Sequence, residues 1–454
     1  MKKRKAGIVL LMIVLSIALI GGQIHGVQAG GKQDISNKPK NVILMVGDGM
    51  GFPQVTAAAY TKRKRGYSPG HLHMQRLTHS GNVITHSHDS VVTDSAASAT
   101  AFSAGHKTDN GYLGQAPRNK RHWDHEHFYN VQTVLEAAEK RGLKTGLVTT
   151  ARLTHATPAA FASHVPDRGM ENEIASQMLT QDIEVLLGGG RRHFLPESEG
   201  GRRDDGRNLL KEADQKGYDV VQDRKSLRKA TGEKLLGVFN DSHLTYELDR
   251  KMTREPHLKT MTKKAIRHLS KSDKGFFLMV EGGRIDHAGH ANHPATNVNE
   301  TLAFDQAVKE AIKFASKDQN TLVIVTADHE TGGMSVGANS EYAYHKDVIR
   351  KVKRTPEYMS KKLKADGSNL EAVLARYAGI KNLKPEEKEI IRSADNTADG
   401  IAKVISDRAL IGWTTDGHTA LNVPIYSYGP YSNRLTGTLD NTLIAKIIFR
   451  AIGD

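Results

Sequence analysis

The sequence predicts an α/β protein, a three-layer sandwich in which helices flank a central, mostly parallel sheet. Three apolar runs have the length and composition of buried strands, and an acidic residue follows each of them. The runs are 41–46 before Asp48, 276–280 before Glu281, and 322–327 before Asp328. Because the carboxyl ends of parallel strands meet at one edge of an open sheet, we expect these acidic residues to form one composite metal site.

The N-terminal residues predict export. Residues 2–5 are Lys-Lys-Arg-Lys, residues 8–20 are almost wholly apolar, and residues 27–29 are Val-Gln-Ala, a pattern that signal peptidase accepts. An uncleaved membrane anchor is the alternative, but the apolar stretch is shorter than the roughly 20 residues of a typical span. We therefore expect residues 1–29 to be a signal peptide cleaved near Ala29, and the protein to be secreted, either extracellular or associated with the cell wall.

Helices and strands alternate along the following residues, as a parallel sheet requires. After the strand at 41–46, the pattern predicts helices at 94–104, 133–140 and 171–180 and strands at 143–149 and 183–187. The charged segment 200–250 is poorly periodic, so we expect it to be peripheral. A helix over 297–315 carries one apolar stripe, which Asp305 interrupts.

Residues 30–454 are predicted to form a single domain with one insertion. The segment of about 337–410 is rich in Lys, Glu and short helical patterns, and it separates Asp328 from His418. The motifs on either side of this segment belong to one predicted site. We therefore expect the segment to lie over the site's edge of the sheet and to belong to the same domain.

Composition limits the chemistry and the partners. The sequence has no cysteine, so a metal must be held by His, Asp, Glu or hydroxyl groups. The net charge is +14, and it is +10 without the four basic residues of the signal peptide, which favours anionic partners. Nucleic acid is a poor candidate as a specific partner, because the protein is exported and lacks a recognition motif. Phosphorylated substrates or an anionic cell wall fit the charge better.

Seven short motifs resemble the alkaline phosphatase family, in that family's order and across nearly the whole chain after the signal. They are Asp48-Gly49-Met50-Gly51, residues 93–101 (TDSAASATA), Thr157-Pro158-Ala159, Gly188-Gly189-Gly190, residues 281–290 (EGGRIDHAGH), residues 326–330 (TADHE) and Gly417-His418-Thr419. The resemblance implies a broad-specificity phosphate monoester hydrolase with an alkaline optimum and a phosphoserine intermediate. It also implies two zinc ions, one magnesium ion, a crown-like insertion and a homodimer.

Ser95 follows an aspartate and precedes an Ala-rich helix, so its hydroxyl is expected at a helix N-terminus. Backbone N–H groups and the helix dipole favour an anion at such a place. Taken alone, a serine in this position is more often a simple N-cap. The resemblance makes Ser95 the nucleophile, which needs a metal or a base to hold its oxygen deprotonated.

The resemblance also implies a set of metal ligands and a phosphate-binding arginine. The four-residue spacing of Asp286 and His290 places both on one face of a helical turn. Arg168 corresponds to the arginine that grips two phosphate oxygens. The implied ligands are Asp48, Asp328 and His329 for the zinc that activates the serine, Asp286, His290 and His418 for the zinc that neutralises the leaving group, and Asp48, Glu281 and Thr157 for magnesium.

Two positions depart from the best-known enteric bacterial pattern. His155 stands where that pattern has an aspartate near magnesium, and His287 stands where it has a lysine. We expect His155 to lie behind the ligands, where a neutral imidazole weakens the pull on magnesium-bound water. We expect His287 to contact phosphate directly or through water, so that its protonation shapes the pH profile.

Two rival functions remain open at the level of sequence. A phosphodiesterase or another metallohydrolase of the same superfamily would share the two-metal core, although a diester lacks one of the free oxygens that Arg168 would grip. A secreted protein that binds the anionic wall, with metals in a purely structural role, would use the charge instead. That second rival has no need of Ser95.

Overall fold

The computed structural model describes residues 37–63, 66, 68–118 and 127–453. The predicted signal peptide, 1–29, lies outside the described residues. Within those ranges, no helix combines the length and the apolar character needed to cross a membrane. Residues 33–454 are grouped in one compact unit.

A ten-stranded sheet forms the centre of this unit, in the order β16-β2-β15-β10-β1-β9-β5-β6-β8-β7. Of these strands, β15 is antiparallel to both of its neighbours, and the other neighbouring pairs are parallel, as predicted. The strands are β1 (Asn41–Val46), β2 (His79–Ile84), β5 (Lys144–Arg152), β6 (Val185–Gly189), β7 (Tyr218–Val221), β8 (Lys234–Val238), β9 (Phe276–Glu281), β10 (Thr321–Thr326), β15 (Val423–Tyr428) and β16 (Gly437–Asp440).

The register of the central strands brings their carboxyl ends level. Val46, the last residue of β1, is paired with Glu281 of β9 on one side and with Thr326 of β10 on the other. All three strands are buried along their whole length, which explains their continuous apolar sequences. The residues that follow β1, β9 and β10 therefore emerge at one edge of the sheet.

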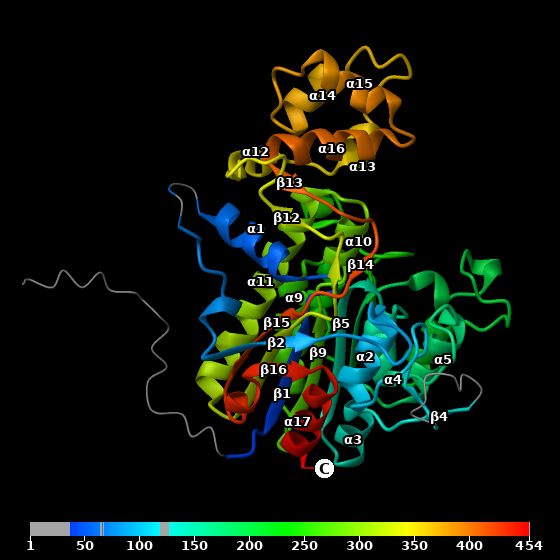
Figure 1. Cartoon of the computed structure of the whole chain (residues 1–454). Coiled ribbons are helices and arrows are strands. Elements are labelled where there is room, and N and C mark those ends of the chain that lie inside the picture. The colour runs from blue at the N-terminus through cyan, green and yellow to red at the C-terminus, as the bar shows by residue number, and fades with distance from the viewer. Residues whose placement is uncertain (1–36, 64–65, 67, 119–126, 454) are drawn as a thin grey trace, which may run out of the picture. The chain divides into compact units, whose positions relative to one another are not determined.

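Helices cover both faces of the sheet, which makes the predicted three-layer sandwich (Figure 1). Helix α9 contacts strands β5 and β9 in one layer, and α3 and α4 contact the same two strands in the other. The first layer holds α1 (Phe52–Lys62), α9 (Leu258–Leu269), α10 (Arg284–His290) and α11 (Pro294–Asp318). The second layer holds α2 (Ser95–Ala104), α3 (Val134–Lys140), α4 (Ala156–Ala162) and α17 (Thr442–Ile452).

The segment predicted as an insertion contains five short helices. They lie between β12 (Ser335–Val336) and β13 (Ile411–Gly412), two short strands that pair with each other at its base. In Figure 1 these helices form a separate layer beyond that pair of strands. They are α12 (Lys346–Lys351), α13 (Pro356–Ser360), α14 (Leu370–Tyr377), α15 (Pro385–Ser393) and α16 (Thr397–Ala409).

The expectation that segment 200–250 is peripheral is wrong. It supplies β7 and β8, the last two strands of the sheet at one end, and β8 pairs with β6. Three residues of β8, Leu235, Leu236 and Val238, are buried. The two strands are only four and five residues long and stand among charged turns, so their pattern is hidden in the sequence. The segment also contains α6 (Leu209–Gln215), α7 (Arg224–Lys229) and α8 (Glu247–Arg250).

Asp305, which interrupts the apolar stripe of α11, has partners inside the protein. Its side chain is fully buried and accepts hydrogen bonds from the backbone N–H of Met74 (3.1 Å) and from Nζ of Lys62 (3.0 Å). A buried carboxylate held in this way stabilises the contact between α11 and the segment that follows α1. It has a structural explanation and needs no ligand.

Candidate active site

The turn after β1 places Asp48 in the middle of the carboxyl edge. Gly49 has φ +71°, a conformation that glycine adopts without strain, and a Cβ there would lie 2.8 Å from Cα of Asp286. The backbone N–H of Gly49 donates to Oδ1 of Asp328 at 3.0 Å. The close approach of this turn brings three acidic residues from distant parts of the chain together.

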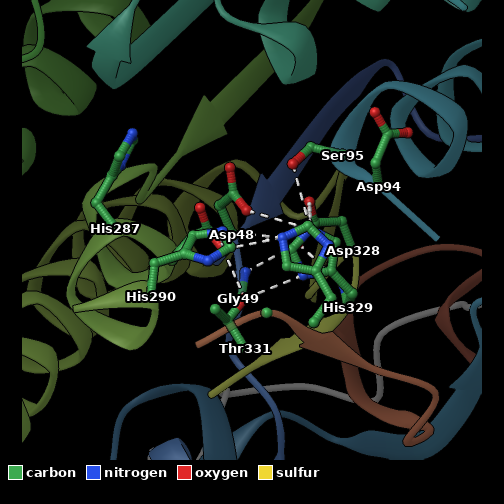
Figure 2. A network of polar contacts seen from close by, with 12 residues as sticks. Asp48, Gly49, Asp94, Ser95, His287, His290, Asp328, His329 and Thr331 are labelled. Atoms are coloured by element: carbon green, nitrogen blue, oxygen red, sulfur yellow. Dashed lines mark hydrogen bonds and ion pairs between the residues drawn. The ribbon is translucent and has the colours of Figure 1, made fainter. Parts of the chain in front are cut away.

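Asp48, Asp328 and His329 form a fully buried group beside Ser95 (Figure 2). Nε2 of His329 lies 3.1 Å from Oδ2 of Asp328, 3.6 Å from Oδ1 of Asp48 and 3.2 Å from Oγ of Ser95. Both carboxylate oxygens of Asp48, and Oδ2 of Asp328, have no hydrogen-bond partner within the described part of the chain. Buried carboxylate oxygens without a partner fit a metal ion, because they cost free energy unless a cation meets them.

Asp286, His290 and His418 form a second group, which is more exposed. Their ligand atoms lie 3.1–3.5 Å apart: His290 Nε2 to Asp286 Oδ1 at 3.3 Å, His418 Nε2 to Asp286 Oδ1 at 3.5 Å, and the two Nε2 atoms at 3.1 Å. The side chain of His290 is 42% exposed, whereas that of Asp286 is 6% exposed. This group is therefore open to solvent on one side, as an ion that must meet a substrate requires.

The histidines of both groups are oriented for metal binding. Nδ1 of His290 donates to the carbonyl of Asp416 (2.5 Å), and Nδ1 of His418 donates to the carbonyl of Thr93 (2.9 Å). A proton on Nδ1 leaves the lone pair of Nε2 free to face a metal ion. Nδ1 of His329 lies 3.2 Å from the hydroxyl of Thr331, which itself donates to Asp286. The donor sets of both groups thus fit bound metal ions.

A third group contains Asp48, Glu281 and His155. Oε1 of Glu281, Oγ1 of Thr157 and Nδ1 of His155 are buried without a partner within the described residues. Nδ1 of His155 lies 3.9 Å from Oδ2 of Asp48, so the imidazole borders this group. Its place behind the magnesium ligands stays a prediction. The oxygens fit a hard cation such as magnesium. Nε2 of His155 accepts from Nη2 of Arg168, so the proton of a neutral imidazole lies on Nδ1, which can donate a hydrogen bond but cannot bind a metal ion.

Burial and mutual repulsion perturb the acids of this edge. Burial, together with the charges of Asp328 and Asp286, raises the pKa of Asp48 well above its usual value. Burial also raises the pKa of Glu281 to about 7. These carboxylates would share protons without a cation, and a bound metal ion restores their charge.

Asp94 joins the nucleophile to the arginine, a role that sequence reasoning missed. It is the N-cap of α2, and Oδ1 accepts from the N–H of Ala97 at 2.9 Å. Oδ2 accepts from Nη1 of Arg168 at 2.9 Å, and Nη2 of Arg168 lies 3.2 Å from Nε2 of His155. Asp94 therefore holds the guanidinium near Ser95. Nothing local in the sequence marks this contact, because Arg168 is 74 residues away.

His287 lies apart from the metal ligands, and its ring points away from His290 in Figure 2. Nδ1 donates to the carbonyl of Gly283 at 2.8 Å. Its ring centroid is 5.5 Å from that of His155 and 4.1 Å from that of His243, a residue that the sequence did not single out. Burial and the charge of Arg284 lower the pKa of His287 to about 3.

The fold and this donor set define the class, which is an α/β metalloenzyme with a buried serine at the centre of its ligand groups. A model of the family described as alkaline phosphatase matches residues 39–453. The chain therefore belongs to the alkaline phosphatase family and is an enzyme that hydrolyses phosphate monoesters.

Individual relatives agree with this assignment. Alkaline phosphatase 3 of Bacillus subtilis is 40% identical over 474 residues, which cover 100% of this chain and 98% of the relative. The crystal structure of the Thermus thermophilus alkaline phosphatase has a TM-score of 0.82 at 31% identity and covers 96% of this chain and 95% of its own. That of the cold-active alkaline phosphatase from Shewanella sp. has a TM-score of 0.81 at 32% identity, covering 91% and 100%.

Proposed function

We propose that the chain cleaves phosphate monoesters with broad specificity through a phosphoserine formed on Ser95. The observation that supports this most is the position of Ser95 Oγ, at the first turn of α2 and 3.2 Å from Nε2 of His329 inside the buried ligand group. The N-terminus of α2 favours the negative charge of a phosphoryl group there.

The reaction has two displacements at phosphorus. Ser95 Oγ, as the alkoxide, attacks phosphorus and the ester P–O bond breaks, which releases the alcohol after it takes up a proton. Water then attacks the phosphoserine, the P–Oγ bond breaks, and inorganic phosphate leaves. Arg168, fixed by Asp94, would bind two of the phosphoryl oxygens in both steps. When bound, the ions supply Lewis-acid stabilisation of the attacking and leaving oxygens.

The proposed cofactors are two zinc ions and one magnesium ion. The buried group beside Ser95 and the exposed group around Asp286 each combine carboxylate and imidazole donors, which suit zinc. The third group offers the oxygens of Asp48, Glu281 and Thr157, which suit magnesium. Metal analysis after dialysis against both ions tests this assignment; a third site filled by zinc under excess magnesium would contradict it.

Ser95→Ala tests the proposed nucleophile. We expect turnover of p-nitrophenyl phosphate to fall to near background, because Ser95 supplies the reacting oxygen. The zinc content should stay the same, because the carboxylates and imidazoles that bind the metal are unchanged. Ser393→Ala, a change of an exposed serine in α15, is the matched control and should keep full turnover. A wall-binding protein with structural metals would instead be indifferent to the loss of Ser95.

Substrate preference separates the monoesterase from its phosphodiesterase rival. Arg168 presents a fork of donors, and a monoester supplies one more free oxygen than a diester. We expect kcat/KM for p-nitrophenyl phosphate to exceed that for bis(p-nitrophenyl) phosphate by orders of magnitude. A preference for the diester would overturn the proposal.

We also propose that the protein is secreted after cleavage near Ala29, that it forms a homodimer, and that its charge of +10 without the signal favours contact with an anionic cell wall. Light scattering on the purified protein tests the homodimer by measuring its molar mass. Sedimentation with purified cell walls tests the wall contact, and binding should decrease as salt is added, because contacts between exposed charges weaken as salt increases.

A further inference from the structure

A cluster of basic side chains continues from Arg168 away from the metal ligands. Nη2 of Arg168 is 3.2 Å from His155, and the rings of His155, His287 and His243 follow at centroid distances of 5.5 and 4.1 Å. Arg284 precedes His287 by three residues in α10, so both share one helix face. Arg284, His287 and His243 are partly exposed, so a ligand can reach them.

Arg284 has no anionic partner among the residues that the structure describes. Its guanidinium lies over the ring of Tyr246, with Cζ 3.7 Å from the centroid, and its Nε is buried without a hydrogen-bond partner. Glu300 interacts with it electrostatically, but the two described side chains form no ion pair, and Glu300 is buried and accepts from the N–H of Glu247 at 2.5 Å. Within the described part of the chain, the guanidinium of Arg284 is therefore held by Tyr246 with no carboxylate bound directly to it.

His243 likewise lacks an acceptor. Its Nδ1 lies 3.3 Å from the backbone N–H of Arg152, and its Nε2 lies 2.5 Å from Nη1 of the same arginine. A neutral imidazole has one N–H, so in either tautomer a donor of His243 faces a donor of Arg152. Glu171 binds Arg152 at Nε, at 2.7 Å, and so does not lie between Nη1 and His243. An anion placed among these groups would satisfy donors that the protein leaves unmatched.

We propose that Arg284, His243 and His287 form a subsite for a second phosphate group of the substrate, next to the phosphoryl group that reacts at Ser95. The preferred substrates would then be phosphate monoesters that carry another phosphate a few bonds from the scissile one. This inference rests on the proposed function of Ser95 and Arg168 and names the substrate class of that site.

A matched pair of substrates tests the subsite on the metal-loaded enzyme. Propane-1,3-diyl bisphosphate and 3-hydroxypropyl phosphate differ only in the second phosphate. We expect kcat/KM, corrected for two equivalent phosphates, to favour the bisphosphate about tenfold, since charged hydrogen bonds are stronger than neutral ones and partial exposure weakens them. The preference should shrink as salt is added.

Arg284→Gln should lower the ratio of the two kcat/KM values about five- to tenfold, and His243→Gln should lower it less, because the imidazole is uncharged. Arg392→Gln removes an exposed arginine of α15 and should leave the ratio unchanged. Calorimetric titration of Ser95→Ala with the bisphosphate, with and without Arg284→Gln, measures binding without turnover and should show the same loss of affinity.

Equal kcat/KM values in the unaltered enzyme would overturn the subsite, and so would an Arg284→Gln variant that loses both activities by the same factor. In either case, hydrolysis of 3-hydroxypropyl phosphate would still support the monoesterase. If the enzyme hydrolyses neither substrate, the proposed function itself fails.

Discussion

Buried carboxylates lie at both edges of the central sheet, and their surroundings differ. At the amino edge, Glu184 precedes β6; its Oε1 meets Nζ of Lys144 at 2.8 Å and its Oε2 accepts from the N–H of Thr145 at 2.7 Å. At the carboxyl edge, Asp48 is fully buried, and neither oxygen has a hydrogen-bond partner within the described chain. A buried acid whose oxygens are matched by the protein serves the fold, whereas a buried acid without such partners fits a cation-binding site.

The difference is also one of free energy. The carboxyl edge gathers like charges in a dry place, which disfavours their ionised forms and costs stability in the metal-free protein. Binding of ions to the folded state alone returns that free energy as stability. The acids at the carboxyl edge therefore lower the stability of the metal-free protein but can bind metal ions, whereas Glu184 at the amino edge stabilises the fold.

Asp48→Asn should produce the largest effect, because Asp48 belongs to two ligand groups. We expect turnover of p-nitrophenyl phosphate to fall by at least about 10²- to 10³-fold. The metal-free protein should become more stable by about 1–3 kcal/mol, since the asparagine side chain no longer has to be protonated, or to repel its neighbours, when it is buried. Urea unfolding in the presence of a chelator measures this; a destabilised metal-free variant would show that Asp48 is matched by the protein after all.

Removal of the metal ions by a chelator should lower both the turnover and the stability of the unaltered protein, because the acids at the carboxyl edge need the ions. Removing the metals should abolish turnover and lower the free energy of unfolding by about 4 kcal/mol when the ions had been present at 1,000 times their Kd. Adding zinc and magnesium should restore both quantities. Calorimetric melting follows the stability, and the Asp48→Asn variant should lose most of the metal-dependent shift. Unchanged turnover after chelation would contradict the proposed metal site.

Glu184→Gln should have the opposite effects to Asp48→Asn: lower stability and unchanged turnover. It weakens the contact with Lys144, whose side chain is 44% exposed, so we expect a loss of stability of about 1 kcal/mol. Turnover per folded molecule should be unchanged, because the amino edge lies at the other ends of the strands. Any fall in kcat at equal metal content would mean that the two edges are coupled.

The sequence predicted the centre of the sheet better than its end. Strands β1, β9 and β10 are continuous apolar runs because both faces are covered, whereas β7 and β8 are short and each contains a charged residue, Asp219 and Lys234. β8 is placed by pairing with β6, and β7 by pairing with β8; no local pattern in the sequence predicts either pairing.

The candidate site shows the same limit. The motif residues could be predicted because each stands in a distinctive local sequence, and their roles as ligands remain predictions. The contacts of Asp94 with Arg168, 74 residues apart, and of Arg152 with His243, 91 residues apart, could not be predicted. Such contacts follow from how distant segments pack, and neither side chain carries a local mark of its partner.

Glu139 provides the test with the smallest expected effect, because its hydrogen bonding is intermediate between that of Glu184 and that of Asp48. Its Oε1 accepts from the hydroxyl of Thr145 at 2.9 Å, but no cation meets it, and burial raises its pKa from 4.5 to about 7. An acid with a raised pKa in the fold contributes its full stability below pH 4.5, and that stability is lost as the pH rises through 7. After allowance for partial exposure, we expect this pH-dependent change in the free energy of unfolding to be about 1 kcal/mol.

The metal-free Glu139→Gln variant should therefore gain stability relative to the unaltered protein between pH 5 and pH 8, as urea unfolding measures. A constant difference across that range would show that Glu139 ionises freely, and that a single neutral hydroxyl is enough to match a buried acid.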